Sequence, residues 1–153
     1  MASSFPAYVV FGHEHTRNED YMPSVTAGET LIPGDLWTWD DTNNKAIRCG
    51  ADPATIMGIS EVDSSKSYTP GGRVPLRLLS PLVTVAMSST TTPVEATHVG
   101  QVYGISRNAA GFWQVDTSDT TNTRVVIVRV DTNPEVWYAQ FLATNLGWDA
   151  IAS

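Results

Sequence analysis

The stretch RVVIVRVDTNPEVWYAQFL, residues 124–142, decides the fold class of this chain. It contains two runs rich in β-branched and aromatic side chains, 124–130 and 136–142, each about as long as one strand. Eight similar runs lie between turn signals along the rest of the sequence: 7–11, 35–39, 45–49, 55–62, 73–79, 82–87, 101–106 and 111–115. The chain is therefore predicted to be all-β, folded as a compact antiparallel β-sandwich or barrel-like domain.

Composition supports this fold class. Threonine and valine contribute 18 and 16 of the 153 residues, and β-branched side chains suit a pleated, half-buried sheet. Helical periodicity is interrupted everywhere by Pro, Gly or β-branched runs, so at most one or two short helical turns are expected. We predict one domain, 1–153, in which an N-terminal strand and arm (1–28) and a C-terminal tail (143–153) flank a β core (29–142).

Turn-forming residues mark how the strands connect. The run DDTNN at 40–44 and the run RNAAG at 107–111 each predict a hairpin, because Asn, Asp and Gly tolerate the backbone of tight turns. The run SSTTTP at 88–93 is interpreted as an exposed loop.

Charge, apolar run length and cysteine count argue against a nucleic-acid partner, a membrane partner and an internal disulfide. The net charge is −7, and the two lysines, Lys45 and Lys66, are far apart, which disfavours a nucleic-acid partner. No apolar run reaches the ~20 residues that span a bilayer, and no signal peptide is recognised, so no membrane partner is expected. A lone cysteine, Cys49, excludes an internal disulfide.

One group of residues could hold a metal. His13 and His15 alternate, so they would share a face of a strand, and Glu19 follows four residues later. This spacing resembles the first motif of cupins, which would imply a metal-binding β-fold. The second cupin motif is missing, since His98 does not stand in it, and a solvated polar loop is the preferred interpretation of the segment. No metal or cofactor is therefore expected, and a cupin-like enzyme is the third-ranked hypothesis.

Catalytic motifs are otherwise missing from the sequence. No serine lies in a Gly-x-Ser-x-Gly elbow, and no Gly-rich loop ends in Lys-Ser or Lys-Thr. Cys49 falls on a predicted strand, where a small buried side chain is the simpler interpretation, and the adjacent Asp40 and Asp41 fit a hairpin tip. We expect a protein that is not an enzyme.

Five tryptophans are unusually many for this length. Trp37 and Trp39 share one face of a predicted strand, Trp137 shares a face with Ala139 and Phe141, and Trp113 shares one with Val115. The simplest prediction is a sandwich core, and a sugar-stacking platform is the functional alternative. For Trp148, in the tail, an interaction role is preferred.

Two stretches resemble structural proteins of tailed-phage heads. The run AGETLIPGDL at 27–36, a hairpin, and the run ADPATIMGI at 51–59 are similar to small β-rich decoration or cement proteins, and 102–125 is similar to segments of phage structural proteins. The resemblance implies a non-enzymatic protein that binds the major capsid protein on the capsid exterior, as a homotrimer at local threefold positions. It would be made in the host cytoplasm and act in the virion.

Segments that cannot form a core alone are candidates for the contact surface. The polar run 12–28 and the tail after Leu142 are expected to order on a partner. The predicted interface residues are Phe5, Tyr8, Tyr21, Trp148 and Ile151. The second-ranked hypothesis is a carbohydrate- or receptor-binding β-module of a phage fibre, using exposed tryptophans.

Overall fold

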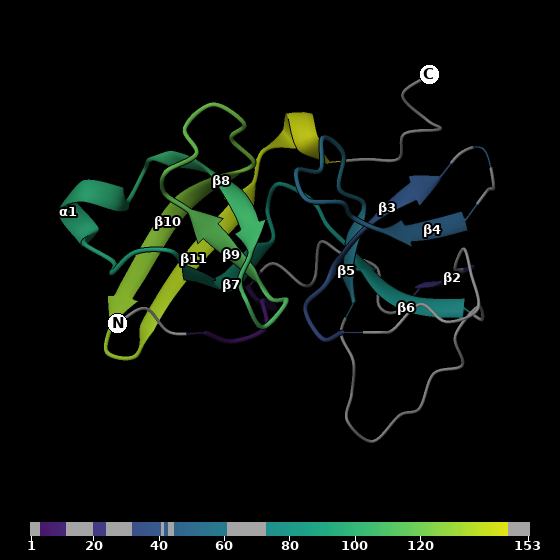
Figure 1. The fold of residues 1–153 in the computed structure, drawn as a ribbon, viewed down its shortest axis with the longest axis horizontal. Coiled ribbons are helices and arrows are strands. Elements are labelled where there is room, and N and C mark those ends of the chain that lie inside the picture. The colour runs from purple at the N-terminus through teal and green to yellow at the C-terminus, as the bar shows by residue number, and fades with distance from the viewer. Residues whose placement is uncertain are drawn as a thin grey trace.

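A computed structural model describes residues 4–11, 20–23, 32–40, 42, 45–60 and 73–146. This part of the chain is nearly all β, which confirms the predicted fold class (Figure 1). The strands are β1 (Tyr8–Phe11), β2 (Asp20–Pro23), β3 (Leu36–Asp40), β4 (Lys45–Arg48), β5 (Gly58–Ser60), β6 (Arg73–Leu78), β7 (Thr84–Ser89), β8 (Val102–Arg107), β9 (Trp113–Asp116), β10 (Val125–Thr132) and β11 (Glu135–Phe141). The helical elements are α1 (Glu95–His98) and a 3-10 turn at Ala143–Asn145, in agreement with the expected one or two turns.

Five strands close into a barrel. They follow the order β7, β11, β10, β8 and β9, and the parallel pairing of β9 with the end of β7 completes the ring. Strand β1 adds to the outer side of β7 as an extra antiparallel strand. The stretch 124–142 supplies β10 and β11, whose antiparallel pairing runs from Val125–Phe141 to Thr132–Glu135.

The barrel interior is filled by the aromatic faces that the sequence predicts. Trp113 and Val115 of β9 are fully buried, and Trp137, Ala139 and Phe141 of β11 are buried beside them. Alternation of large buried side chains with half-exposed neighbours along β9 and β11 matches the period of two that a sheet imposes. The prediction that these tryptophans form core is therefore confirmed.

A second sheet lies beside the barrel, at the right of Figure 1. Its order is β2, β6, β5, β3 and β4, all antiparallel. Its own small core consists of Trp37, Ala46, Met57 and Leu76, with Trp39 packed against it. The predicted hairpin at 40–44 is confirmed, because Asp40 pairs with Lys45 across β3 and β4.

The main core extends from the barrel to the second sheet. Leu36 of β3, Ile59 of β5 and Ile56, which lies just before β5, belong to the same buried cluster as Trp113 and Trp137 of the barrel. The seam between the sheets is also crossed by the N-terminal segment, since a side chain on Gly34 (φ 71°) would collide with the backbone of Ala7. Only glycine fits that turn.

Each predicted strand overlaps an observed one, but three details differ. Residues Asp20–Pro23, within the segment expected to be an arm, pair with β6 as strand β2. Ser88 and Ser89, expected in an exposed loop, are buried because they extend β7 to pair with β9 and close the barrel. The strand predicted at 55–62 is described only as Gly58–Ser60, with Ile56 forming a separate bridge to Leu146.

Candidate interaction surface

Among the described residues, a hydrogen-bonded charged cluster lies where the two sheets meet. We call this cluster of Asp35, Arg48, Arg107 and Trp113 the brace. The Asp35 carboxylate is fully buried and accepts hydrogen bonds from Trp113 Nε1 at 2.8 Å, from Arg107 at 2.9 Å and from Arg48 Nε. Arg107 also stacks over the Trp113 ring, 4.5 Å from its centroid, and donates to the carbonyl of Cys49. These contacts tie β4 and the turn before β3 to the β8–β9 hairpin, so the cluster joins the two sheets.

Two further arginines are also paired with carboxylates. Arg124 contacts Asp52 at 3.1 Å, and Arg129 makes a two-pronged contact with Asp131 at 2.9 and 3.0 Å. Of these two pairs, the one between Arg129 and Asp131 is the more exposed at its arginine, whose side chain is 66% exposed against 12% for that of Arg124.

The candidate site is an aromatic surface on the outside of the sheet. Register places Tyr8 of β1 opposite Ala86 of β7, Ala86 opposite Tyr138 of β11, and Tyr138 opposite Arg129 of β10. Directly paired residues project to the same face, so these four form one row across four strands. We call the row, together with Phe5, the aromatic row.

Packing within the aromatic row is close. Phe5 and Tyr8 have ring centroids 5.9 Å apart, and Ala86 is completely covered although it lies on the outer face. Tyr8 itself remains 46% exposed. A partner protein that binds this surface would bury the exposed part of the Tyr8 ring.

Electrostatics make one end of the aromatic row nearly neutral. Arg129 lies 4.9 Å from the centroid of the Tyr138 ring, and the Tyr138 hydroxyl donates to Asp131 at 2.9 Å. Hydrogen bonds from Arg129 and then Tyr138 lower the pKa of Asp131, while burial and the bond to Asp131 raise the pKa of Tyr138. At neutral pH the ion pair is therefore formed and the phenol is protonated.

The structure brings together two of the five predicted interface residues. Phe5 and Tyr8 are neighbours in the aromatic row. Tyr21 lies in β2, and its side chain is outside the described residues, as are Trp148 and Ile151. Sequence reasoning missed Tyr138 and Arg129, although the inward face of Trp137 and Ala139 already requires Tyr138 to point outward.

The metal hypothesis rests on positions outside the described part of the chain. His13, His15 and Glu19 all fall there, and no cluster of three or more His, Cys, Asp or Glu side chains able to hold a metal occurs among the residues that are described. His98 has a local role instead: its Nδ1 accepts the backbone N–H of Val94 at 2.9 Å, and its ring lies 4.7 Å from that of Trp137.

Three of the tryptophans considered for a sugar-stacking platform have no exposed ring on which a sugar could stack. Trp37, Trp113 and Trp137 are completely buried, and Trp39 is half-buried against the second core. A sugar ring cannot stack on an indole that has no exposed face.

Cys49 behaves as the buried side chain that the sequence predicts. Burial, and then the nearby Asp35 charge, raise the pKa of its thiol to about 12. At pH 8 only about one thiol in ten thousand would be ionised, so we expect native protein to react with Ellman's reagent at least ~1000-fold more slowly than unfolded protein. A stopped-flow comparison in buffer and in urea measures the ratio, and rapid native labelling would contradict the burial of Cys49.

Comparisons with known proteins add no relationship to this geometry. Neither family models, nor curated proteins, nor solved structures yielded a match to the chain. Within the described residues, no helix has the length and apolar character needed to cross a membrane.

Proposed function

We propose that the protein is a structural virion component that binds the outer surface of a phage capsid and stabilises it. The observation that carries this proposal is the aromatic row, which presents Phe5, Tyr8 and Tyr138 on the outside of a braced β scaffold. Buried aromatic side chains are the commonest hot spots of protein interfaces. The resemblance of 27–36, 51–59 and 102–125 to decoration proteins supports the capsid as the partner.

A braced scaffold suits such a role. A preformed sheet loses little conformational entropy on binding, because Phe5 and Tyr8 already contact each other and Tyr8 and Tyr138 flank Ala86 in the sheet register. The acidic balance of −7 keeps free copies soluble and is complementary to a basic partner surface.

The proposal includes a homotrimer, as the resemblance to decoration proteins implies. Three linked copies convert weak single contacts into tight attachment without enlarging any contact. A trimer on the capsid would place three aromatic rows on neighbouring subunits of the major capsid protein.

Binding to heads tests the proposal. The purified chain is mixed with empty phage heads assembled from the proposed partner, a major capsid protein. Bound protein is measured by sedimentation, and the mass of the complexed oligomer is measured by native mass spectrometry. We expect a trimer, and the double variant Phe5→Ser/Tyr8→Ser should weaken binding at least ~30-fold, because two hot-spot rings are lost.

The matched control is Val94→Ser, since Val94 is 49% exposed, close to the 46% of Tyr8, but lies beside α1 and outside the aromatic row. It should bind like the unmodified chain. Failure of the unmodified chain to bind heads, or a monomer both free and bound, would overturn the proposal. Binding to glycans instead of heads would favour the module of a phage fibre.

A further inference from the structure

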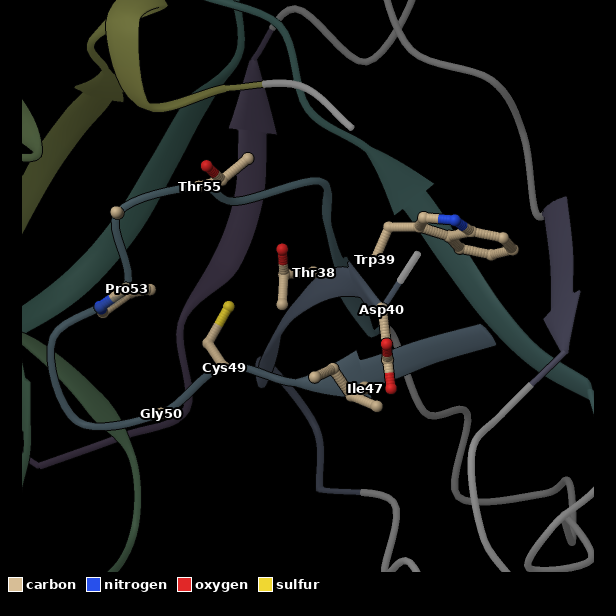
Figure 2. A pocket seen from close by; sticks show the side chains of 9 residues that line it. Thr38, Trp39, Asp40, Ile47, Cys49, Gly50, Pro53 and Thr55 are labelled. Atoms are coloured by element: carbon tan, nitrogen blue, oxygen red, sulfur yellow. The ribbon is translucent and has the colours of Figure 1, made fainter. Parts of the chain in front are cut away.

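An open pocket of about 380 Å³ lies between the β3–β4 hairpin and the loop that follows β4. Figure 2 shows Thr38 and Ile47 of the hairpin on one side, with Pro53 and Thr55 of the loop on the other. Thr38 and Ile47 are cross-strand partners, so they project from the same face of the hairpin. A cavity of this volume is within the range of sites that hold small ligands.

The pocket continues the apolar face of the main core. Leu36 of β3 and Cys49, just after β4, are two positions from Thr38 and Ile47, and both are buried in that core. Because side chains two apart along a strand share a face, Thr38 and Ile47 extend the same face outward. They are only half-buried, so an apolar group placed in the pocket would cover them and enlarge the core.

The lining suits a side chain that is apolar except for one hydrogen-bond donor. Ile47, Pro53 and Ala54 contribute hydrocarbon surface. Thr38 and Thr55 each bring a hydroxyl that can accept a hydrogen bond. An indole has the matching combination, with a broad apolar ring and a single N–H. Tryptophan is therefore the side chain that this part of the lining fits best.

The first residues of the C-terminal tail are held against the loop wall of the pocket. Leu146 bridges to Ile56 and packs against the main core. The Asn145 carbonyl accepts the backbone N–H of Ile56 at 2.7 Å, and the Asn145 side-chain amide donates to the carbonyl of Ala54 at 3.2 Å. These contacts fix the point at which the rest of the tail begins.

The direction of the chain at Leu146 favours a pocket on another copy. Residues 147–153 lie outside the described part of the chain, and Trp148 is the one aromatic residue among them. The bridge between Leu146 and Ile56 is parallel, so the chain at Leu146 runs toward the Met57 side of that bridge. The loop wall of the pocket consists of residues that precede Ile56. Reversing a chain takes about four residues, and Trp148 is only two beyond Leu146, so the chain cannot turn back to its own pocket before Trp148.

We propose that this pocket binds the Trp148 ring of a neighbouring copy of the same chain. The ring packs on Ile47, Pro53 and Ala54, and its N–H donates to a threonine hydroxyl of the lining. Tail and pocket are different surfaces, so the contact is heterologous, and copies that each give a tail to the next close into a ring. That the ring contains three copies rests on the proposed function, whereas recognition of Trp148 by the pocket does not.

The first experiment identifies the occupant without the capsid. The isotope-labelled full chain carrying Trp148→Ala, which lacks the competing ring, is titrated with the acetylated peptide LGWDAIAS, residues 146–153. A control peptide has alanine in place of the tryptophan. We expect the first peptide to shift the amide signals of Thr38, Gly50 and Thr55 with a Kd on the order of millimolar, and the control to shift none of them. Equal shifts with both peptides, or no shifts with either, would overturn the inference.

Two alanines of the loop provide matched variants of the Trp148→Ala chain. Ala51 and Ala54 are both exposed, but only Ala54 lines the pocket. Ala54→Asp puts a charge where the ring packs and should raise the Kd of the peptide about fivefold. Ala51→Asp adds the same charge outside the pocket and should change that Kd less than about twofold. Equal effects of the two substitutions would show that the peptide binds elsewhere, which contradicts the inference.

Oligomer measurements decide whose tail fills the pocket. Sedimentation equilibrium of the unmodified full chain should show an oligomer that dissociates on dilution. Trp148→Ala should raise the midpoint concentration of dissociation at least ~30-fold, because a hot-spot ring is lost, and Ala54→Asp should raise it more than Ala51→Asp. A chain that stays monomeric while its pocket signals differ from those of the Trp148→Ala variant would hold its own tail, and the assignment to a neighbouring copy would be wrong.

These results are independent of binding to heads. If Trp148→Ala leaves the oligomer intact, the copies are joined elsewhere and the inference fails, although the proposed function stands if the unmodified chain binds heads. If the oligomer responds as expected but the unmodified chain binds no heads, the proposed function fails and the contact between tail and pocket remains.

Discussion

Replacing Asp35 by alanine is expected to lower the free energy of unfolding by about 3–5 kcal/mol, because it leaves two arginines and an indole N–H at the seam without their shared acceptor. Arg48 and Arg107 converge on this one carboxylate from β4 and β8, and Trp113 Nε1 donates to it from inside the barrel. Both arginine side chains are only 27% exposed, so water replaces the lost partner poorly.

Urea unfolding followed by circular dichroism measures this loss. Asp52→Ala is the matched control, since Asp52 also contacts an arginine but is 51% exposed, and an exposed pair contributes no more than about 1 kcal/mol. Equal effects of the two substitutions would show that the brace at Asp35 contributes no more than an ordinary surface ion pair.

Removing the chain after Leu146 is expected to leave the fold intact and to weaken capsid binding at least ~30-fold, because Trp148 and Ile151 are predicted interface residues and each hot spot contributes ~2 kcal/mol or more. The truncation point matters. Asn145 accepts the backbone N–H of Ile56 at 2.7 Å, and Leu146 bridges to Ile56 and packs against the main core. A cut after Leu142 would remove these contacts and confuse lost stability with lost binding.

Thermal unfolding of the truncated chain provides the control, and its midpoint should match that of the full chain within a few degrees. Sedimentation with empty heads then measures binding. If the shortened chain binds as tightly as the full one, the tail is not part of the contact and the aromatic row alone carries it.

The local pattern of the sequence was sufficient to predict the strands and their inward faces. Alternation along 136–142 places Trp137, Ala139 and Phe141 inside, and the structure buries all three. The turn at 107–111 was predictable for the same reason: the Asn108 side chain accepts backbone N–H groups of Ala110 and Phe112, and Gly111 adopts a positive φ of 86°. Side-chain period and turn chemistry depend on neighbours in the sequence, so a single chain reveals them.

Pairings between distant segments were decided only by the tertiary structure. The barrel closes through the parallel contact of Ser88 and Ser89 with β9, and β2 forms because β6 offers Asp20–Pro23 an edge. Asp35 looks like an ordinary turn aspartate until Arg107 and Trp113, more than seventy positions away, reach it. The aromatic row likewise needs the register of three strands before Tyr8 and Tyr138 flank Ala86. Such contacts depend on how sheets close and pack, and that information lies in the sum of many long-range contacts rather than in any local run of residues.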